Sequence, residues 1–136
     1  MSVVLDGSAA LAHALHDERG DRIARLFEAV AEGGAVVPAL WHLEVANGLE
    51  MAVRRRRLSR ADADDVLGDL AHYAIEVDGE THLRAWIETR KLAHQHRLTL
   101  YDAAYLELAA RRELPLATLD ADLAKAAKRA GVPLAL

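Results

Sequence analysis

The chain has 136 residues, 52% of them hydrophobic, which suffices for a single domain over residues 1–136 with one substantial core. The absence of cysteine excludes zinc-thiolate sites, disulfide scaffolds and thiol nucleophiles. The net charge of -4 argues against a protein that holds nucleic acid mainly through a positive surface field.

The N-terminal quarter predicts strand, helix, helix and strand in that order. The β-branched run Val3–Leu5 predicts the first strand, and Ser8 stands where an N-cap should precede a helix over residues 9–15. Apolar residues at positions i, i+3, i+4 and i+7 of the range 23–30 predict a second helix, which two glycines end. Residues 35–37 are the second predicted strand.

The next part of the chain predicts two helices and a strand. Pro38 suits a helix start, so residues 40–57 are predicted as one long helix that ends in a run of four arginines. Ser59 begins another helix, because Asp62 lies three residues on at the spacing of a capping box. Residues 73–77 are a weak third strand.

The last third continues the alternation of helix and strand. Residues 80–96 and 101–112 are predicted helices, and residues 114–119 are the fourth predicted strand. A short helix rich in Ala and Lys then ends at Gly131, and the apolar tail 132–136 is a candidate fifth strand.

Apolar strands separated by helices indicate a parallel sheet, because parallel strands need helical crossovers that cover both faces. The sequence therefore predicts an α/β fold, a three-layer α/β/α sandwich with about five parallel strands. No stretch approaches the roughly 20 apolar residues of a membrane span, and the start MSVVLDGS has no basic leader. We expect a soluble cytoplasmic protein with no membrane partner.

One acidic residue falls on each of four segments that should reach the same edge of the sheet. These residues are Asp6, Glu44, Asp102 and Asp120. In open parallel sheets, ligands collect outside the carboxyl ends of the strands, where such residues would converge.

Each acid also has a structural explanation when it is taken alone. Asp6 suits a solvated strand end, and Asp120 suits an N-cap. Asp102 follows Thr99 by three residues, a helix-start spacing. Glu44 is the hardest to explain structurally, because it interrupts an aromatic and aliphatic run.

Together the four acids indicate a metal site. Clustered carboxylates repel one another, which raises their pKa values unless a cation lies between them. Oxygen ligands without Cys or suitably spaced His favour Mg²⁺ or Mn²⁺ over zinc. Such a site can polarise a phosphodiester and activate water.

Three blocks of sequence carry a family resemblance. The segments VVLDGSAALA, PALWHLEVANGL and LTLYDAAYLELAARRELPLATLDADLAKAA, in this order, resemble a PIN domain of the VapC type, the toxin half of bacterial toxin-antitoxin pairs. The resemblance covers essentially the whole chain, although Gly7 stands where the family usually has Ala. It implies a five-stranded PIN-like sheet and a metal-dependent ribonuclease that cuts single-stranded RNA or exposed loops.

The resemblance also implies roles for residues and partners. Asp6 and Asp102 would bind Mg²⁺ (or Mn²⁺), while Glu44 and Asp120 would act through waters or orient the attacking water. Four further residues would play supporting roles in the site: Ser8, Asn47, Thr118 and Asp122. Helix packing explains Asn47 equally well, and Asp122 also suits an exposed first helical turn. A small antitoxin whose tail covers the acidic pocket, often with an Arg among the carboxylates, and a second copy in a homodimer are the implied protein partners.

Two other functions compete with this interpretation. One is a PIN-fold module that binds RNA or protein without turnover, which a complete set of acids disfavours. The other is a magnesium-dependent phosphatase, but Ser8 occupies the place of its second Asp. The run Arg54–Arg57 either contacts RNA phosphates or is a solvated helix end, and no histidine is assigned to catalysis.

Overall fold

The computed structural model describes residues 1–15 and 20–136. Its sheet has the strand order β3-β2-β1-β4, and every strand pair in it is parallel. The strands are β1 (Val3–Leu5), β2 (Ala35–Val37), β3 (Ile75–Val77) and β4 (Leu116–Ala117). Val4 of the central strand β1 pairs with Val36 on one side and with Leu116 on the other.

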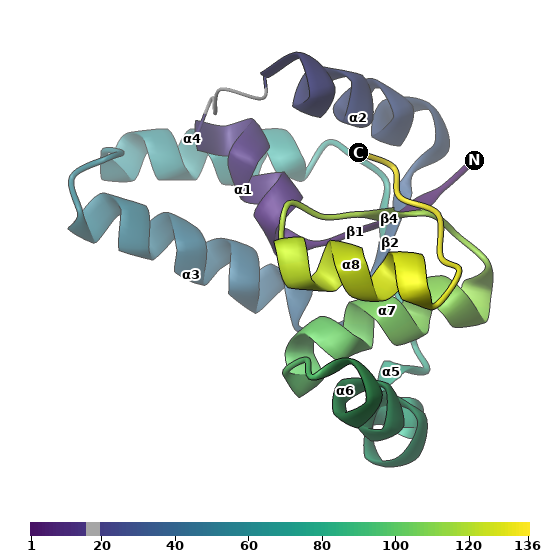
Figure 1. The fold of residues 1–136 in the computed structure, drawn as a ribbon. Coiled ribbons are helices and arrows are strands. Elements are labelled where there is room, and N and C mark those ends of the chain that lie inside the picture. Colours follow the sequence, from purple (N-terminus) through teal and green to yellow (C-terminus); the bar gives the residue numbers. More distant parts are fainter. Residues whose placement is uncertain (16–19) are drawn as a thin grey trace.

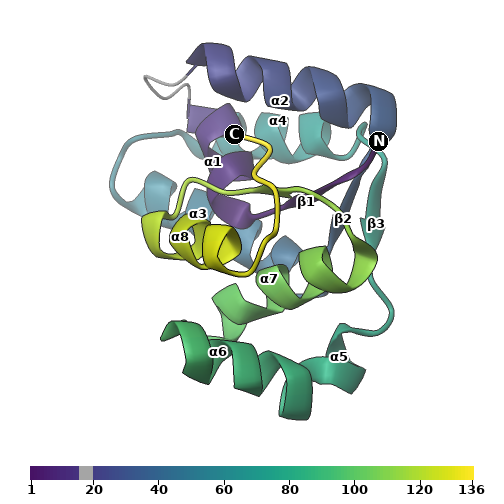
Figure 2. The same cartoon turned by 45° about the vertical axis from the view of Figure 1, so that its right-hand side comes forward.

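Helices cover both faces of this sheet. They are α1 (Gly7–Leu15), α2 (Gly20–Gly33), α3 (Trp41–Arg54), α4 (Arg60–Leu70), α5 (Thr81–Arg84), the π-helical turn η1 (Ala85–Thr89), α6 (Arg90–His96), α7 (Leu100–Arg112) and α8 (Ala121–Arg129). Figures 1 and 2 show α1, α2 and α4 on one side of the strands and α7 on the other. α3 contacts α1 and α4, and α8 contacts α7. No helix in the described part of the chain is long and apolar enough to cross a membrane.

Helix α7 is enclosed between the sheet and an outer helical layer. It contacts β1 and β4 on its inner side, while η1 and α6 contact it from outside, as Figure 2 shows. Residues 103–109 are therefore all buried, including Glu107. This enclosure explains why α7 lacks a simple apolar stripe, since both of its faces pack against protein.

The three-layer α/β/α architecture is confirmed, but the sheet has four strands rather than about five. The apolar tail forms a single parallel bridge, Leu116 with Leu134, in place of a fifth strand. Leu116 donates its N–H to the Pro133 carbonyl, and its own carbonyl accepts from Ala135. Pro133 has no N–H to donate, which limits how far this pairing can extend.

Three predicted helices differ from the observed ones. α1 begins at Gly7, so Ser8 lies inside the helix rather than at its N-cap, and its hydroxyl donates to Asp6. The helix predicted over 40–57 ends at Arg54, because Arg56 adopts φ 59° and Arg57 donates its N–H to the Ala52 carbonyl, a Schellman ending without glycine. The helix predicted over 80–96 is divided into α5, η1 and α6 by the π-helical turn.

Candidate active site

The sheet has its topological switch point between β1 and β4, and we call the region at the carboxyl ends of these two strands the crevice. These strands are neighbours, yet β1 leads into α1 on one side of the sheet and β4 leads into α8, which packs with α7 on the other (Figure 1). Ligands bind where the connections of adjacent parallel strands diverge in this way. Asp6 directly follows β1, and Asp120 lies three residues beyond β4.

Asp6 is the most deeply buried acid of this crevice, with only 4% of its surface exposed. The hydroxyls of Ser8 and Thr118 both donate to its Oδ2 atom, at 2.8 Å and 2.6 Å. These hydroxyls in turn accept the backbone N–H groups of Leu119 and Asp120, each at 3.0 Å. One oxygen of Asp6 is thus held by two side chains whose own positions are fixed by the backbone.

Glu44 reaches the crevice from the start of α3, alongside α1. A Cβ atom at Gly7 would lie 3.5 Å from Glu44 Cβ, an ordinary van der Waals contact, so an alanine would fit at this position. The hydroxyl of Tyr105 donates a hydrogen bond to Glu44 Oε1. Burial, and secondarily Glu44, raise the pKa of Tyr105, which keeps this hydroxyl protonated as a donor.

Asp102 and Asp120 stand at helix starts. Thr99 caps α7 by accepting the Asp102 N–H at 3.1 Å through its Oγ1 atom. Asp120 caps α8 through its own carboxylate, since Oδ1 accepts the Leu123 N–H at 2.8 Å. Asp120 is therefore the N-cap of α8, as its structural explanation required, and it also lies at the crevice.

The pKa values of three of the acids show that the cluster acts as one electrostatic unit. Burial raises the pKa of Asp6 more than its hydroxyl donors lower it, and the charge of Asp120 raises it further. Burial also raises the pKa of Glu44, with added repulsion from Asp6 and Asp102. The pKa of Asp102 is raised by burial and then by Asp120 and Asp6. Such a cluster favours a cation between its members.

The donor set suits a hard divalent ion held partly through water. Among residues 1–15 and 20–136, no three acidic or histidine side chains stand close enough together to hold an ion directly. Mg²⁺ commonly takes one or two carboxylates and keeps several waters. Four carboxylates around one crevice, with raised pKa values in three of them, fit that mode of binding.

Of the four supporting residues predicted from the sequence, two contact an acid of the site directly and two are exposed. Ser8 and Thr118 contact Asp6. Asp122 is exposed, but its charge reaches Asp102 and raises the pKa of that acid. Asn47 is exposed, and within the described residues the partner of Glu44 is Tyr105 instead.

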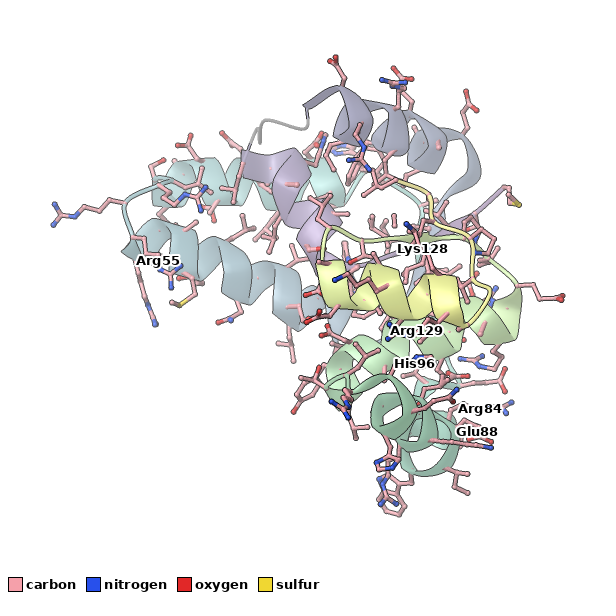
Figure 3. The ribbon with its side chains drawn as sticks, viewed as in Figure 1. Arg55, Arg84, Glu88, His96, Lys128 and Arg129 are labelled. Atoms are coloured by element: carbon pink, nitrogen blue, oxygen red, sulfur yellow. The ribbon has the colours of Figure 1, made fainter. Side chains whose placement is uncertain are left out.

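The arginine run lies away from the crevice. All four of its side chains are exposed, and Figure 3 shows Arg55 at the far end of α3.

Sequence reasoning missed Tyr105 as a site residue. It lies three residues after Asp102 on α7, a spacing that places both on the same face of a helix. The three-residue spacing from Asp102 is the feature of the sequence that could have identified Tyr105 as a site residue. The same segment has many other apolar positions, so the spacing does not single Tyr105 out. Only its contact with Glu44, 61 residues away, separates it from an ordinary core residue.

Tyr105→Phe is expected to move the acid limb of activity to higher pH. The hydroxyl of Tyr105 lowers the pKa of Glu44, so its loss should raise that pKa further and keep Glu44 protonated at higher pH. The lost donor should also cost about 1–3 kcal/mol of unfolding free energy. The pH profile of kcat/KM for the RNA cleavage proposed below measures the effect, with Tyr73→Phe as the control. An unchanged profile would show that the hydroxyl does not set the charge of Glu44.

Comparisons with known proteins place this geometry in a family. The PIN domain family matches residues 3–129. Ribonuclease VapC3 from Pyrobaculum aerophilum is 31% identical over 125 residues, which are 92% of this chain and 94% of that protein. The crystal structure of PAE2754 from Pyrobaculum aerophilum superposes with a TM-score of 0.68 at 27% identity, covering 93% of this chain and 87% of the other. The chain therefore belongs to the PIN-domain family, within its VapC group.

Proposed function

We propose that the protein is a divalent-metal-dependent endoribonuclease and the toxin of a toxin-antitoxin pair. The observation that carries the proposal is the convergence of four carboxylates at the crevice between β1 and β4, with Asp6 buried and held by two hydroxyls. The relation to a protein named Ribonuclease VapC3 supports RNA as the substrate.

Each site residue has a distinct part in the proposed mechanism. Asp6 and Asp102 hold Mg²⁺ or Mn²⁺, which when bound polarises the phosphodiester and lowers the pKa of water. Ser8 and Thr118 fix the orientation of Asp6. Glu44, held by Tyr105, and Asp120 would orient the attacking water through hydrogen bonds.

The direct test is cleavage of RNA by the purified protein. We expect cleavage with Mg²⁺ or Mn²⁺, loss of cleavage in EDTA, and recovery when the metal is restored. RNA that is bound but never cut under any divalent metal would instead indicate a silent binding module. Turnover of a small phosphate ester without turnover of RNA would indicate a phosphatase.

The proposed protein partners are a small antitoxin and a second copy of the chain. An acidic crevice whose carboxylates have raised pKa values suits an arginine from an antitoxin tail, because the charge-assisted bonds would relieve the repulsion. Co-purification with the product of the neighbouring reading frame tests the first partner. Light scattering of the isolated protein tests the second.

A further inference from the structure

The outer helical layer carries a groove that the four acids do not use. Its volume is about 610 Å³, and it is lined by Trp86, Ile87, Arg90, Lys91, His94 and Leu100. Trp86 is 83% exposed and Ile87 is 72% exposed, which is unusual for side chains of this size. Both stand on η1, which contacts α7 from the outer helical layer.

The groove is positively charged although the protein as a whole carries -4. Between Thr81 and Arg97 the chain has four Lys and Arg residues and one acid, Glu88. Arg84 is paired with Glu80 and Glu88, at 3.2 Å and 3.8 Å, and Figure 3 shows Arg84 and Glu88 together on this layer. The cations of the groove itself, Arg90 and Lys91, form no ion pair with any described residue.

The groove adjoins the acidic crevice through the first turn of α7. Leu100 lines the groove, and Asp102, two residues later, belongs to the acid cluster. Successive residues of a helix are rotated by about 100° and rise by about 1.5 Å. Leu100 and Asp102 therefore point to different sides of α7 from the same first turn, and Tyr101, which is 66% exposed, lies between them around the helix.

We propose that this groove binds single-stranded RNA next to the scissile phosphate, with a base stacked on Trp86 and phosphates contacting Arg90 and Lys91. An exposed aromatic ring beside unpaired cations is the combination that holds unpaired nucleotides, because stacking tolerates any base and the cations follow the backbone. The inference rests on the proposed function, since it identifies the part of the substrate held beside the acids.

The charge of the groove favours RNA over a second copy of the chain. In a two-fold symmetric dimer the same patch meets itself. Such an interface would gather Arg90 and Lys91 of both copies on one patch, with no acid among its lining residues to pair with them. A polyanion instead neutralises both cations and releases counterions.

The test compares two replacements of Trp86 in RNA binding, measured in EDTA by fluorescence anisotropy of a labelled oligoadenylate. Trp86→Leu keeps an apolar side chain without a ring and should weaken binding roughly 5- to 150-fold. Trp86→Phe keeps a ring and should retain most of the affinity. The exposed position predicts little change in stability for either variant.

The cation part of the site is tested by salt dependence. The double variant Arg90→Ala and Lys91→Ala should reduce the slope of log affinity against log salt by about 1.4, or 0.7 for each lost contact with single-stranded RNA. The matched control is Arg22→Ala with Arg25→Ala, an exposed pair on α2 that should leave the slope unchanged. Equal slopes in all three proteins would exclude phosphate contacts at the groove.

These outcomes separate the groove from the nuclease activity. In cleavage assays Trp86→Leu should raise KM by a similar factor and leave kcat nearly unchanged, because it does not contact the reacting atoms. Cleavage with an unaltered KM would overturn the groove and leave the nuclease intact. Trp86-dependent binding without cleavage in any metal would support the groove and overturn the nuclease. A wild-type dimer that becomes monomeric in Trp86→Leu would show that this face joins two copies and would overturn the RNA site.

Discussion

Replacing Asp6 by Asn should reduce RNA cleavage at least about a hundredfold without unfolding the protein. Loss of a group that merely orients a metal ligand costs 10- to 100-fold, so removing the charge of the proposed ligand itself should cost no less. The amide oxygen of Asn can still accept the hydroxyls of Ser8 and Thr118, which preserves the local structure. Retained cleavage after removal of contaminating nucleases would overturn the assignment of Asp6.

Stability gives an independent check on the same variant. The folded-state pKa of Asp6 is raised, so its contribution to stability is greatest below its ordinary value, near 4, and falls as the pH rises through the raised pKa. At neutral pH the charge therefore opposes folding, and Asp6→Asn should not lower the unfolding free energy of the metal-free protein. Asp64→Asn, at an exposed position of α4, is the matched control and should change neither activity nor stability.

Metal binding should stabilise the wild type and the Asp64→Asn control far more than it stabilises Asp6→Asn. Metal at a hundred times its Kd should stabilise the wild type by about 2.7 kcal/mol, because the ion binds only the folded state. Asp6→Asn should show little of this gain, and the Asp64→Asn control should show all of it. Equal stabilisation of the three proteins by Mn²⁺ would place the ion elsewhere.

Replacing Arg111 by Ala should destabilise the fold by about 3–5 kcal/mol, the largest effect we expect on stability. Arg111 donates to Asp78 Oδ2 at 2.7 Å and to Glu107 Oε2 at 2.8 Å. The side chains of these acids are only 4% and 5% exposed, so the variant would leave Glu107 without its cation and Asp78 with only the more distant guanidinium of Arg112, at 3.8 Å. The network joins the end of β3 to α7, which carries Asp102 and Tyr105.

Urea unfolding measures this loss, and the neighbouring residue supplies a control. Arg112 pairs at 2.6 Å with Glu76, whose side chain is 59% exposed, so Arg112→Ala should cost no more than about 1 kcal/mol. A loss in Arg111→Ala as small as that in Arg112→Ala would mean that the buried acids are satisfied without Arg111.

The same network predicts a dependence of stability on pH. Burial raises the pKa of Asp78, but hydrogen bonds from Arg111 and Thr81 and the Arg111 charge outweigh it and lower the pKa to about 2. The contribution of Asp78 is therefore fully present above its ordinary value, near 4, and is lost as the pH falls from about 4 to about 2. Arg111→Ala should lose most of this dependence, because the main cause of the lowered pKa is gone.

Local patterns in the sequence predicted most of the secondary structure, and they failed where a backbone detail was decisive. The apolar runs of β1 and β2 were predicted with the bounds that the structure has. The end of α3 was missed, because Arg56 takes a left-handed conformation that usually marks glycine. The predicted fifth strand is reduced to one bridge. The tail 132–136 has the apolar composition of a strand, but Pro133 has no N–H for backbone pairing.

Helix α7 shows the limit of pattern reasoning in the site. Its sequence carries Asp102, Tyr105 and Glu107 within six positions, and nothing local tells their environments apart. In the fold, Asp102 faces the crevice, Tyr105 donates to Glu44, and Glu107 pairs with Arg111 inside the protein. These differences arise because α7 is covered on both sides by elements distant in sequence.

The sequence by itself determined the α/β class through its hydrophobic periodicity, and the resemblance of three sequence blocks indicated the family. It predicted the four acids from residue type at strand ends and helix starts. The tertiary structure alone decided that β1 and β4 are neighbours, and hence that Asp6 and Asp120 flank one crevice. It also decided that Glu44 is held by Tyr105 and that Trp86 lies exposed beside Arg90 and Lys91. Strand order and pairwise contacts depend on the packing of distant segments, which no local pattern encodes.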